Sequence, residues 1–200
     1  MPNSGLPTYG RLSLICGPMF SGKTTELLKR ILWARNGQNR EIAVFKPSFD
    51  QRYSKERIVS HEGLVSDALA ISAWEGLTQS LVEQETTMVF FDEIQFFVDP
   101  HFDGDLIEII RELLRSGIDV CCAGLDMDWR GEAFHNSAMI GAMAEEMIKI
   151  AAYCSVCGQP ATRSFKKSGA GDSIELGSVE LYEPRCTKHW VEETDQVRLI

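Results

Sequence analysis

The residues whose types and spacing have the clearest chemical meaning form a glycine-rich loop near the start of the chain. The loop comprises Gly17, Pro18, Met19, Phe20, Ser21, Gly22, Lys23 and Thr24. It follows an apolar run and opens into a helical pattern, the context in which G-x-x-x-x-G-K-[ST] binds phosphate through backbone N–H groups. Lys23 would reach the β- and γ-phosphates, and the Thr24 hydroxyl would hold Mg²⁺. The sequence therefore predicts binding of a nucleoside triphosphate, against the alternative of a glycine-rich turn that matches by chance.

Two acidic residues, Asp92 and Glu93, end another apolar run at 87–91. An acid at the end of a buried strand can hold Mg²⁺ opposite Thr24, and the alternative for Asp92 is a helix N-cap. A carboxylate beside bound phosphates can accept a proton from an attacking hydroxyl, which makes Glu93 a candidate general base. The residue types leave open whether that hydroxyl belongs to water or to a substrate, or whether Glu93 is only a surface acid.

A third constellation has the spacing of a metal site. Cys154-x-x-Cys157 is followed, further along the chain, by Cys186-x-x-His189. Four nitrogen and sulfur ligands in two short hooks suit tetrahedral Zn²⁺ with no open position, so we expect a structural ion. The alternatives are unrelated cysteines and, for His189, a surface histidine.

The other three cysteines, Cys16, Cys121 and Cys122, lie in apolar runs. We expect them to be buried reduced thiols that behave as small hydrophobic residues.

Apolar runs and helical periods alternate along the chain as far as residue 153. Strands are expected at 11–16, 41–46, 87–93, 118–124 and 148–153, and helices at 22–36, 73–83, 105–116 and 137–147. Shorter strands are expected within 58–61 and 64–71, and a loop at 47–56. Because strands alternate with helices, the pattern predicts a parallel sheet covered by helices on both faces, an α/β fold.

The character of the sequence changes at Cys154, where short segments with Gly and Ser replace the alternating pattern. The 200 residues allow one domain of ordinary size with a small appendage. The expected organisation is an N-terminal tail at 1–10, an α/β nucleotide-binding domain at 11–153, a zinc-binding lobe at 154–191 and a C-terminal tail at 192–200. The loop at 162–184, between the metal hooks, is suited to covering a ligand; a plain hairpin of a zinc ribbon is a compatible alternative.

Composition narrows the classes of partner. The formal net charge of −9 argues against a duplex nucleic-acid binder, because such proteins usually carry a basic face. No apolar run approaches the roughly 20 residues that a membrane-spanning helix needs. Residues 1–10 lack the basic and apolar segments of a signal peptide. We therefore expect a soluble cytoplasmic protein that binds neither nucleic acid nor membrane.

Several segments, taken in order, resemble a known family. They are GPMFSGKTTEL from Gly17, FKPSFDQRYS from Phe45, FDEIQFF from Phe91 and GLDMDWRGE from Gly124, followed by the four-ligand metal pattern. Together they resemble the type II thymidine kinases, which contain zinc, over residues 11–190. The resemblance implies a P-loop NTPase-like parallel sheet with helices on both faces, plus a small zinc-ribbon lobe that carries a lasso loop.

The resemblance also implies a reaction. The γ-phosphoryl group of ATP would pass to the 5′-hydroxyl of thymidine to give dTMP in pyrimidine salvage, with deoxyuridine as a further acceptor. Glu93 matches the family's general base, and Arg52 matches an arginine that stabilises the transferring phosphate. Lys23, Thr24 and Asp92 match the phosphate and Mg²⁺ positions. ATP, Mg²⁺ and structural Zn²⁺ are the implied cofactors, dTTP the implied feedback inhibitor and a homotetramer the implied assembly.

Six residues match positions that wall the family's thymine pocket, and a seventh, Ser164, matches a threonine near the base. The seven are Met19, Phe96, Leu125, Trp129, Phe134, Ser164 and Tyr182. The chain departs from the usual family residues at Trp129, Ala133 and His135, which bears on the shape of the pocket and leaves the phosphate chemistry unchanged.

Two other readings use the same motifs. A nucleic-acid-stimulated P-loop ATPase with a zinc ribbon would account for the loop and the metal, although the acidic composition argues against it. A regulatory nucleotide-binding module without turnover would account for the loop alone. Formation of ADP that depends on thymidine distinguishes the kinase from both.

Overall fold

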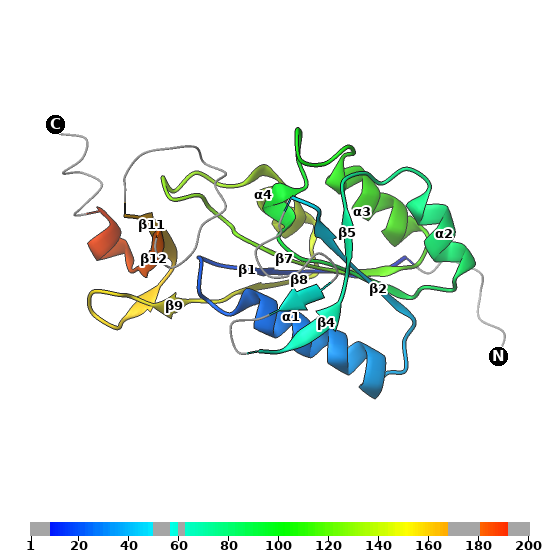
Figure 1. Cartoon of the computed structure of the whole chain (residues 1–200), viewed down its shortest axis with the longest axis horizontal. Helices are drawn as coiled ribbons and strands as arrows, with labels where there is room; N and C mark the ends of the chain where they lie inside the picture. Colours follow the sequence, from blue (N-terminus) through cyan, green and yellow to red (C-terminus); the bar gives the residue numbers. More distant parts are fainter. Residues whose placement is uncertain (1–8, 50–56, 60–62, 168–180, 192–200) are drawn as a thin grey trace.

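A six-stranded sheet forms the centre of the protein, in a computed structural model that describes residues 9–49, 57–59, 63–167 and 181–191 (Figure 1). Every neighbouring pair in the sheet is parallel. In spatial order the strands are β5 (Leu69–Ile71), β2 (Ile42–Pro47), β6 (Met88–Phe91), β7 (Asp119–Gly124), β1 (Leu12–Cys16) and β8 (Glu146–Lys149).

Successive side chains along each strand point to opposite faces of the sheet, so the core consists of two layers, one on each face. In β1, Leu12 and Leu14 pack into one layer and Ile15 packs into the other, as a period of two requires. The first layer is covered by α2 (Leu77–Glu83), α3 (Leu106–Arg115) and α4 (His135–Met143). The second is covered by α1 (Lys23–Leu32), which continues into a π-helical turn at Trp33–Gly37, and by the hairpin of β3 (Arg57–Val59) and β4 (Val65–Asp67). Figure 1 shows helices on opposite sides of the sheet, which confirms the predicted fold class.

The expected end of the fourth helix was wrong. We expected a helix at 137–147 and a strand at 148–153, whereas α4 ends at Met143 and β8 begins at Glu146. The N–H of Glu145 donates to the carbonyl of Leu12 (3.0 Å), and the Glu145 carboxylate accepts the Leu12 N–H (2.6 Å). Pairing with β1 therefore outweighs the helix propensity of the Ala- and Met-rich segment, a tertiary effect that local pattern does not report.

The second expected helix also begins later than predicted. It was expected at 73–83, but α2 starts at Leu77, after Gly76 adopts a left-handed conformation with φ 76°. Trp74 is instead part of the core, where its ring meets Phe45 at a centroid distance of 5.1 Å. The short strands expected within 58–61 and 64–71 correspond to β3, β4 and β5 over their described residues.

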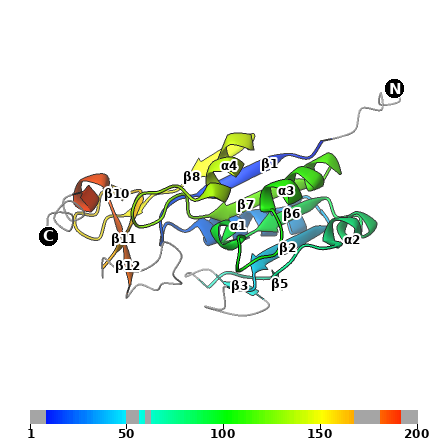
Figure 2. The ribbon, with the colours of Figure 1, turned by 90° about the horizontal axis from the view of Figure 1, so that it is seen from above.

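Beyond β8 the chain forms two small hairpins. One pairs β9 (Ala152–Tyr153) with β10 (Pro160–Ala161), and the other pairs β11 (Arg163–Lys166) with β12 (Tyr182–Arg185). They lie at the opposite end of the molecule from α2 (Figures 1 and 2). Among the described residues, their buried apolar cluster consists of Ala152, Cys154 and Ala161, with Cys186 partly buried against it. A cluster of this size contributes little stability, so we expect a further source of stability in this part of the chain. The division of the chain at residues 153 and 154 stays a prediction.

The three cysteines in the apolar runs are buried, as expected. The Cys16, Cys121 and Cys122 side chains are buried reduced thiols, and burial raises the pKa of each of them.

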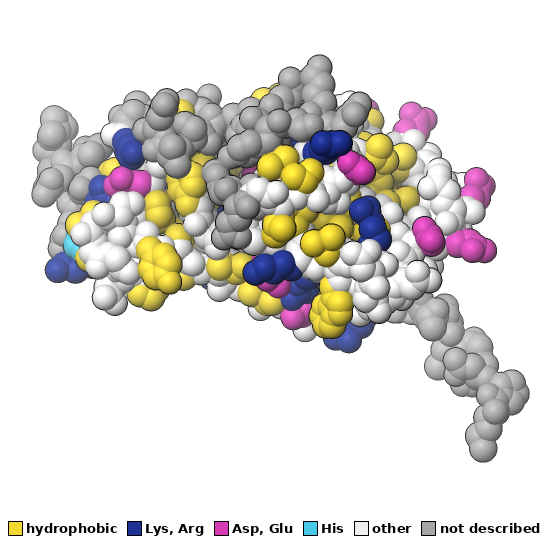
Figure 3. Space-filling view, turned by 60° about the horizontal axis from the view of Figure 1, so that its bottom comes forward, with side chains coloured by type: hydrophobic (Ala, Val, Ile, Leu, Met, Phe, Trp, Pro, Cys, Tyr) yellow, Lys and Arg dark blue, Asp and Glu magenta, His cyan; other side chains and the backbone are white. Residues whose placement is uncertain are grey.

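Among the described residues on the face in Figure 3, basic side chains lie among acidic and apolar ones instead of forming one continuous stripe. None of the helices in the described part of the chain has the length and apolar character that crossing a bilayer requires.

Two glycines fix the path of the chain between β1 and α1. Gly17 has φ 145°, and a Cβ added there would lie 2.2 Å from the carbonyl oxygen of Ile150. Gly22 has φ 84° immediately before α1, with open space where a Cβ would be. Only glycine combines the positive φ with the close backbone approach at Gly17, whereas Gly22 needs the positive φ alone.

This difference predicts unequal effects of the same substitution. Gly22→Ala should lower the free energy of unfolding by about 1–2 kcal/mol, the cost of a left-handed conformation for an L-residue. Gly17→Ala should cost more, because the added methyl overlaps the Ile150 carbonyl as well. Urea unfolding monitored by circular dichroism measures both values. Gly76→Ala is the matched control, since Gly76 also precedes a helix with positive φ and open space; an equal loss at Gly17 and Gly76 would contradict the argument.

Candidate functional site

The glycine-rich loop leads directly into the N-terminus of α1, as the motif predicts. Glu26 N–H donates to Gly22 O (3.0 Å), so the first turn of α1 closes on a residue that has no side chain to cap it. The Lys23 ammonium is buried and donates to the carbonyl of Pro18 (2.6 Å), and the Ser21 hydroxyl donates to the same carbonyl (2.9 Å). The loop therefore presents a lysine and the backbone N–H groups of a helix terminus at one place, an arrangement that binds phosphate.

Thr24 and Asp92 come together although they lie on different elements. The Thr24 hydroxyl is 3.4 Å from Oδ2 of Asp92, which is buried at the end of β6. The other carboxylate oxygen of Asp92 accepts the N–H of Glu93 (3.0 Å). A hydroxyl and a carboxylate beside a phosphate-binding loop form the oxygen donor set that Mg²⁺ prefers, so these residues fit the ion.

Glu93 follows β6 in an unusual backbone conformation. Its φ of 54° and ψ of 46° are left-handed, and its carbonyl accepts the N–H of Phe96 (3.0 Å) to close the 3₁₀ turn Ile94–Phe96. This turn takes Glu93 out of the alternating direction of the strand, so Asp92 and Glu93 do not simply face opposite sides of the sheet. A left-handed non-glycine residue beside a ligand site is a common sign of function.

Gln95 is a residue of the site that the motif analysis did not single out. Its side chain is buried, and its amide nitrogen donates to the Glu93 carboxylate while its amide oxygen accepts the N–H of Leu125 (3.0 Å). The available signal was a polar residue inside the apolar stretch Ile94–Phe97. A long polar side chain at such a position must find partners of its own.

Four of the seven predicted pocket residues join the zinc-binding lobe to the phosphate loop and to the segment after β7. The Met19 N–H donates to the hydroxyl of Ser164 on β11 (3.0 Å). The Lys166 ammonium lies 5.8 Å from the ring centre of Trp129 and 5.9 Å from that of Tyr182, within the range of cation–π attraction. The lobe therefore contacts the phosphate loop directly.

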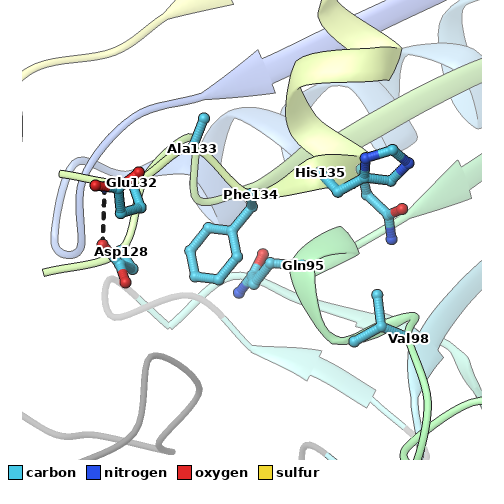
Figure 4. A pocket seen from close by; sticks show the side chains of 8 residues that line it. Gln95, Val98, Asp128, Glu132, Ala133, Phe134 and His135 are labelled. Carbon is cyan, nitrogen blue, oxygen red and sulfur yellow. Dashed lines mark hydrogen bonds between the residues drawn. The ribbon is translucent and has the colours of Figure 1, made fainter. Parts of the chain in front are cut away.

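The other three predicted pocket residues lie closer to Gln95. Leu125 binds it through the backbone, and Phe96 is buried with its ring 5.5 Å from that of Phe49. Phe134 lines a cavity of about 230 Å³ together with Gln95 (Figure 4). Phe134 is the only one of the seven that lines this cavity, although Ala133 and His135, where the chain departs from the family, also line it.

A buried aspartate organises the segment that carries Trp129 and Phe134. The Asp128 carboxylate accepts the N–H groups of Arg130 (2.8 Å) and Glu132 (2.9 Å), and its backbone N–H donates to the carbonyl of Glu132 (2.9 Å). Figure 4 shows the Asp128 and Glu132 pair beside the Phe134 ring. At its other end the segment packs on the zinc-binding lobe, because the indole of Trp190 donates to the carbonyl of Trp129 (3.1 Å). Arg52, the predicted second catalytic residue, lies outside the described residues.

The four predicted zinc ligands converge. The Cys154, Cys157 and Cys186 sulfurs and a ring nitrogen of His189 all lie within 4.8 Å of one another. Cys157 Sγ is 3.9 Å from Cys186 Sγ, while His189 Nδ1 is 3.6 Å from Cys154 Sγ and 3.2 Å from Cys186 Sγ. A tetrahedral ion with Zn–S bonds of about 2.3 Å separates two sulfur ligands by about 3.8 Å, so the cluster fits structural zinc.

Electrostatics at this centre favour a thiolate at Cys154. Burial opposes ionisation, but hydrogen bonds from the backbone N–H groups of Cys186, Val156 and Cys157 and from His189 lower the pKa of Cys154 to about 6. The thiolate is the form that binds metal, so the site has its first anionic ligand near neutral pH.

Comparison with known proteins identifies a family for most of the chain. The sequence profile described as thymidine kinase matches residues 10–190. Similar solved structures include domain III of the replication initiation protein DnaA from Thermotoga maritima, with 14% identity and a TM-score of 0.39. The Pif1 helicase from Candida albicans has 16% identity and a TM-score of 0.38, and the Aeropyrum pernix ORC2 protein has 16% identity and a TM-score of 0.43. The aligned regions cover 73%, 70% and 73% of this chain, and 56%, 36% and 43% of those three chains.

We predict that the thermal stability of the protein depends on bound zinc. Purified protein should contain one zinc ion per chain by elemental analysis, and Cys157→Ser should lose it. Because the apolar core in the described part of the lobe is small, loss of the metal should lower the melting temperature by roughly 5 °C or more. Val156→Ala is the matched control, since Val156 lies in the same hook and is largely exposed. Unchanged melting in metal-free Cys157→Ser protein would contradict a structural role.

Proposed function

Because the chain belongs to the thymidine kinase family, we propose that it transfers the γ-phosphoryl group of ATP to the 5′-hydroxyl of thymidine and releases dTMP. Family membership makes the protein an ATP-dependent deoxynucleoside kinase, with thymidine and ATP as small-molecule substrates. The observation that carries the proposal is the contact between Asp92 and Thr24 (3.4 Å), which brings the end of β6, and with it the neighbouring residue Glu93, to the phosphate loop. A kinase needs a proton acceptor at this position, where the nucleoside hydroxyl attacks the terminal phosphate.

The phosphate loop would bind and neutralise the triphosphate. In this proposal Lys23 leaves the Pro18 carbonyl and contacts the β- and γ-phosphates, while the N–H groups at the start of α1 bind phosphate oxygens. Thr24 and Asp92 would hold the Mg²⁺ ion that accompanies ATP and supplies charge neutralisation when bound. Arg52 is assigned to the transferring phosphate by resemblance to the family.

Glu93 would act as the general base. Its carboxylate accepts the proton of the 5′-hydroxyl as the oxygen attacks the γ-phosphorus, and ADP leaves on the opposite side. Water would compete for the same phosphoryl group unless it is excluded. The β11–β12 hairpin supports this exclusion, because Ser164 binds Met19 of the phosphate loop and so brings the lobe next to the loop.

The nucleoside would lie among the seven predicted pocket residues. In support, three of them, Met19, Leu125 and Ser164, are linked by hydrogen bonds to the phosphate loop or to the Glu93 turn. Two more, Trp129 and Tyr182, lie around the same buried lysine, Lys166. Aromatic and apolar walls of this kind suit a flat pyrimidine, with a few polar groups to orient it.

Regulation and assembly follow the family resemblance. We propose that dTTP is a feedback inhibitor, since it carries both the thymine that the pocket would bind and the phosphates that the loop would bind. We also propose a homotetramer and a place in pyrimidine salvage. Inhibition by dTTP that competes with thymidine, and a tetrameric mass by light scattering, test the first two.

The first test of the reaction is Glu93→Gln. The substitution keeps the volume of the side chain and removes the proton acceptor, so kcat should fall by about 10²- to 10⁴-fold while KM for ATP changes little. Chromatography of ADP and dTMP from ATP, Mg²⁺ and thymidine measures the reaction. Glu41→Gln is the matched control, because Glu41 is exposed just before β2 begins, at the end of that strand away from the phosphate loop.

Two outcomes would contradict the proposal in different ways. Full turnover of thymidine by Glu93→Gln would mean that another group takes the proton. Release of ADP that does not depend on thymidine would make water the acceptor and the protein an ATPase.

A second prediction concerns the choice of base. Deoxyuridine differs from thymidine by one methyl group, and an apolar pocket distinguishes such a pair by about 1–3 kcal/mol. The ratio of kcat/KM for thymidine to that for deoxyuridine should therefore lie between about 10 and 200. Steady-state assays with both nucleosides measure this ratio. A ratio far above the range would mean that polar groups of the pocket also distinguish the two bases.

A further inference from the structure

We propose that Gln95 positions the Glu93 carboxylate for catalysis and connects it to the backbone of Leu125. The inference rests on the proposed function, because it takes Glu93 as the base. Gln95 is assigned as a positioning residue that acts through Glu93.

The contacts of Gln95 are few and buried. Only 2% of the residue is exposed. Its Nε2 lies 2.5 Å from Oε2 of Glu93, and its Oε1 accepts the N–H of Leu125 at 3.0 Å. The single amide thus bridges the turn after β6 and the residue that follows β7.

The chemistry of the two partners fixes the orientation of the amide. A backbone N–H can only donate, and an ionised carboxylate can only accept. The oxygen of Gln95 must therefore face Leu125, and the NH₂ group must face Glu93. A hydrogen bond to an ionised acceptor is about twice as strong as one between neutral groups, so the contact restrains one carboxylate oxygen of the base.

The surroundings are built to keep Gln95 in this place. A Cβ at Gly124 would lie 2.6 Å from Oε1 of Gln95 and 2.5 Å from a side-chain carbon of Ile94, so a glycine is needed there. On the other side of the turn, the buried amide of Asn136 donates to the carbonyls of Ile94 (3.0 Å) and Phe97 (3.1 Å). The backbone of the turn is therefore held independently, and the Gln95 side chain remains available to orient Glu93.

Restraining the Glu93 carboxylate should increase the rate of the chemical step. A glutamate has several rotamers, and a displacement of about 1 Å from the productive geometry can cost about 100-fold in rate. Held by Gln95, the carboxylate of Glu93 keeps its position relative to Asp92 and Thr24 before the nucleoside enters. The link to Leu125 also connects the base to a predicted wall of the nucleoside pocket.

Gln95→Glu separates this role from simple core packing. The variant has nearly the same shape and can still accept the Leu125 N–H, but it places a second carboxylate against Glu93. Two carboxylates in contact repel each other when both are ionised, so the last proton of the pair leaves with a raised pKa. The other charged groups assigned to the site, Asp92, Lys23 and Arg52, are the same in this variant, so a change in pH dependence reports the new carboxylate.

The expected result is a kcat at pH 7 reduced by about 10-fold or more, with activity recovering toward higher pH as the acidic limb of the profile moves up by about one pH unit or more. Gln95→Met, which removes both hydrogen bonds and keeps the volume, should lower kcat by about 10- to 100-fold. Its acidic limb should move up less than that of Gln95→Glu, because the Glu93 carboxylate only loses a hydrogen bond to its ionised form. In both variants KM for ATP should stay near the wild-type value. Gln79→Glu is the matched control, because Gln79 donates to Glu83 (2.8 Å) in an exposed amide–carboxylate pair on α2.

The outcomes distinguish this inference from the proposed function. If Glu93→Gln is inactive but Gln95→Glu keeps the wild-type pH profile, the positioning role is overturned and the kinase mechanism stands. If Glu93→Gln retains full activity, the base assignment itself fails. Should Gln95→Glu not fold, a wild-type kcat in Gln95→Met overturns the inference.

A further measurement needs no change at position 95. In ¹⁵N-glutamine-labelled protein, the side-chain amide protons of Gln95 should exchange slowly with solvent, and their resonances should shift in Glu93→Gln. Rapid exchange in the wild-type protein, or resonances that do not respond to Glu93→Gln, would also overturn the inference.

Discussion

The pairing register of three strands determines where the chemistry can occur. β7 lies between β1 and β6, with Cys16 opposite Gly124 and Phe91 opposite Cys122. Because the strands are parallel and end at nearly the same level, the segments that follow them meet at one edge of the sheet. The phosphate loop, the Asp92–Glu93 pair and Leu125 are therefore neighbours. No single segment contains the site, and a shift of one residue in any pair would turn the strand's side chains to the other face.

At this edge, local backbone strain replaces regular strand geometry. The backbone of Glu93 is in the left-handed conformation. At position 17 the backbone lies so close to the carbonyl of Ile150 that only glycine fits. The conformation of Glu93 costs free energy, and the hydrogen bonds of Asp92 and Gln95 to Glu93 and of Asn136 to the neighbouring Ile94 stabilise it. Stability provided by the two apolar layers is in this way used to keep a few polar groups in fixed positions.

Much of this could be predicted from the sequence, because the relevant signals are local. The phosphate motif, the apolar runs and the two metal hooks each lie within a few residues, and the structure brings Thr24 near Asp92 and gathers the four metal ligands as expected. What could not be predicted depends on contacts between distant segments. The pairing of β8 with β1 ended α4 early, and the bridge from Glu93 through Gln95 to Leu125 joins strands that are distant in sequence. A local pattern of residue types predicts neither the pairing of β8 with β1 nor the Gln95 bridge.

The zinc-binding lobe connects its metal ligands to the phosphate loop. The buried cluster in the described part of the lobe is small, so we expect the metal ligands on either side of the β11–β12 hairpin to restrain it. The restrained hairpin then presents Ser164 to the phosphate loop, and Trp190 packs on the segment that carries Trp129. The lobe that the metal centre would restrain thus contacts the phosphate loop through one hydrogen bond and the segment after β7 through another. Loss of the ion should therefore first loosen the contacts of the lobe with the phosphate loop, because the two apolar layers of the sheet contain no described residue of the lobe.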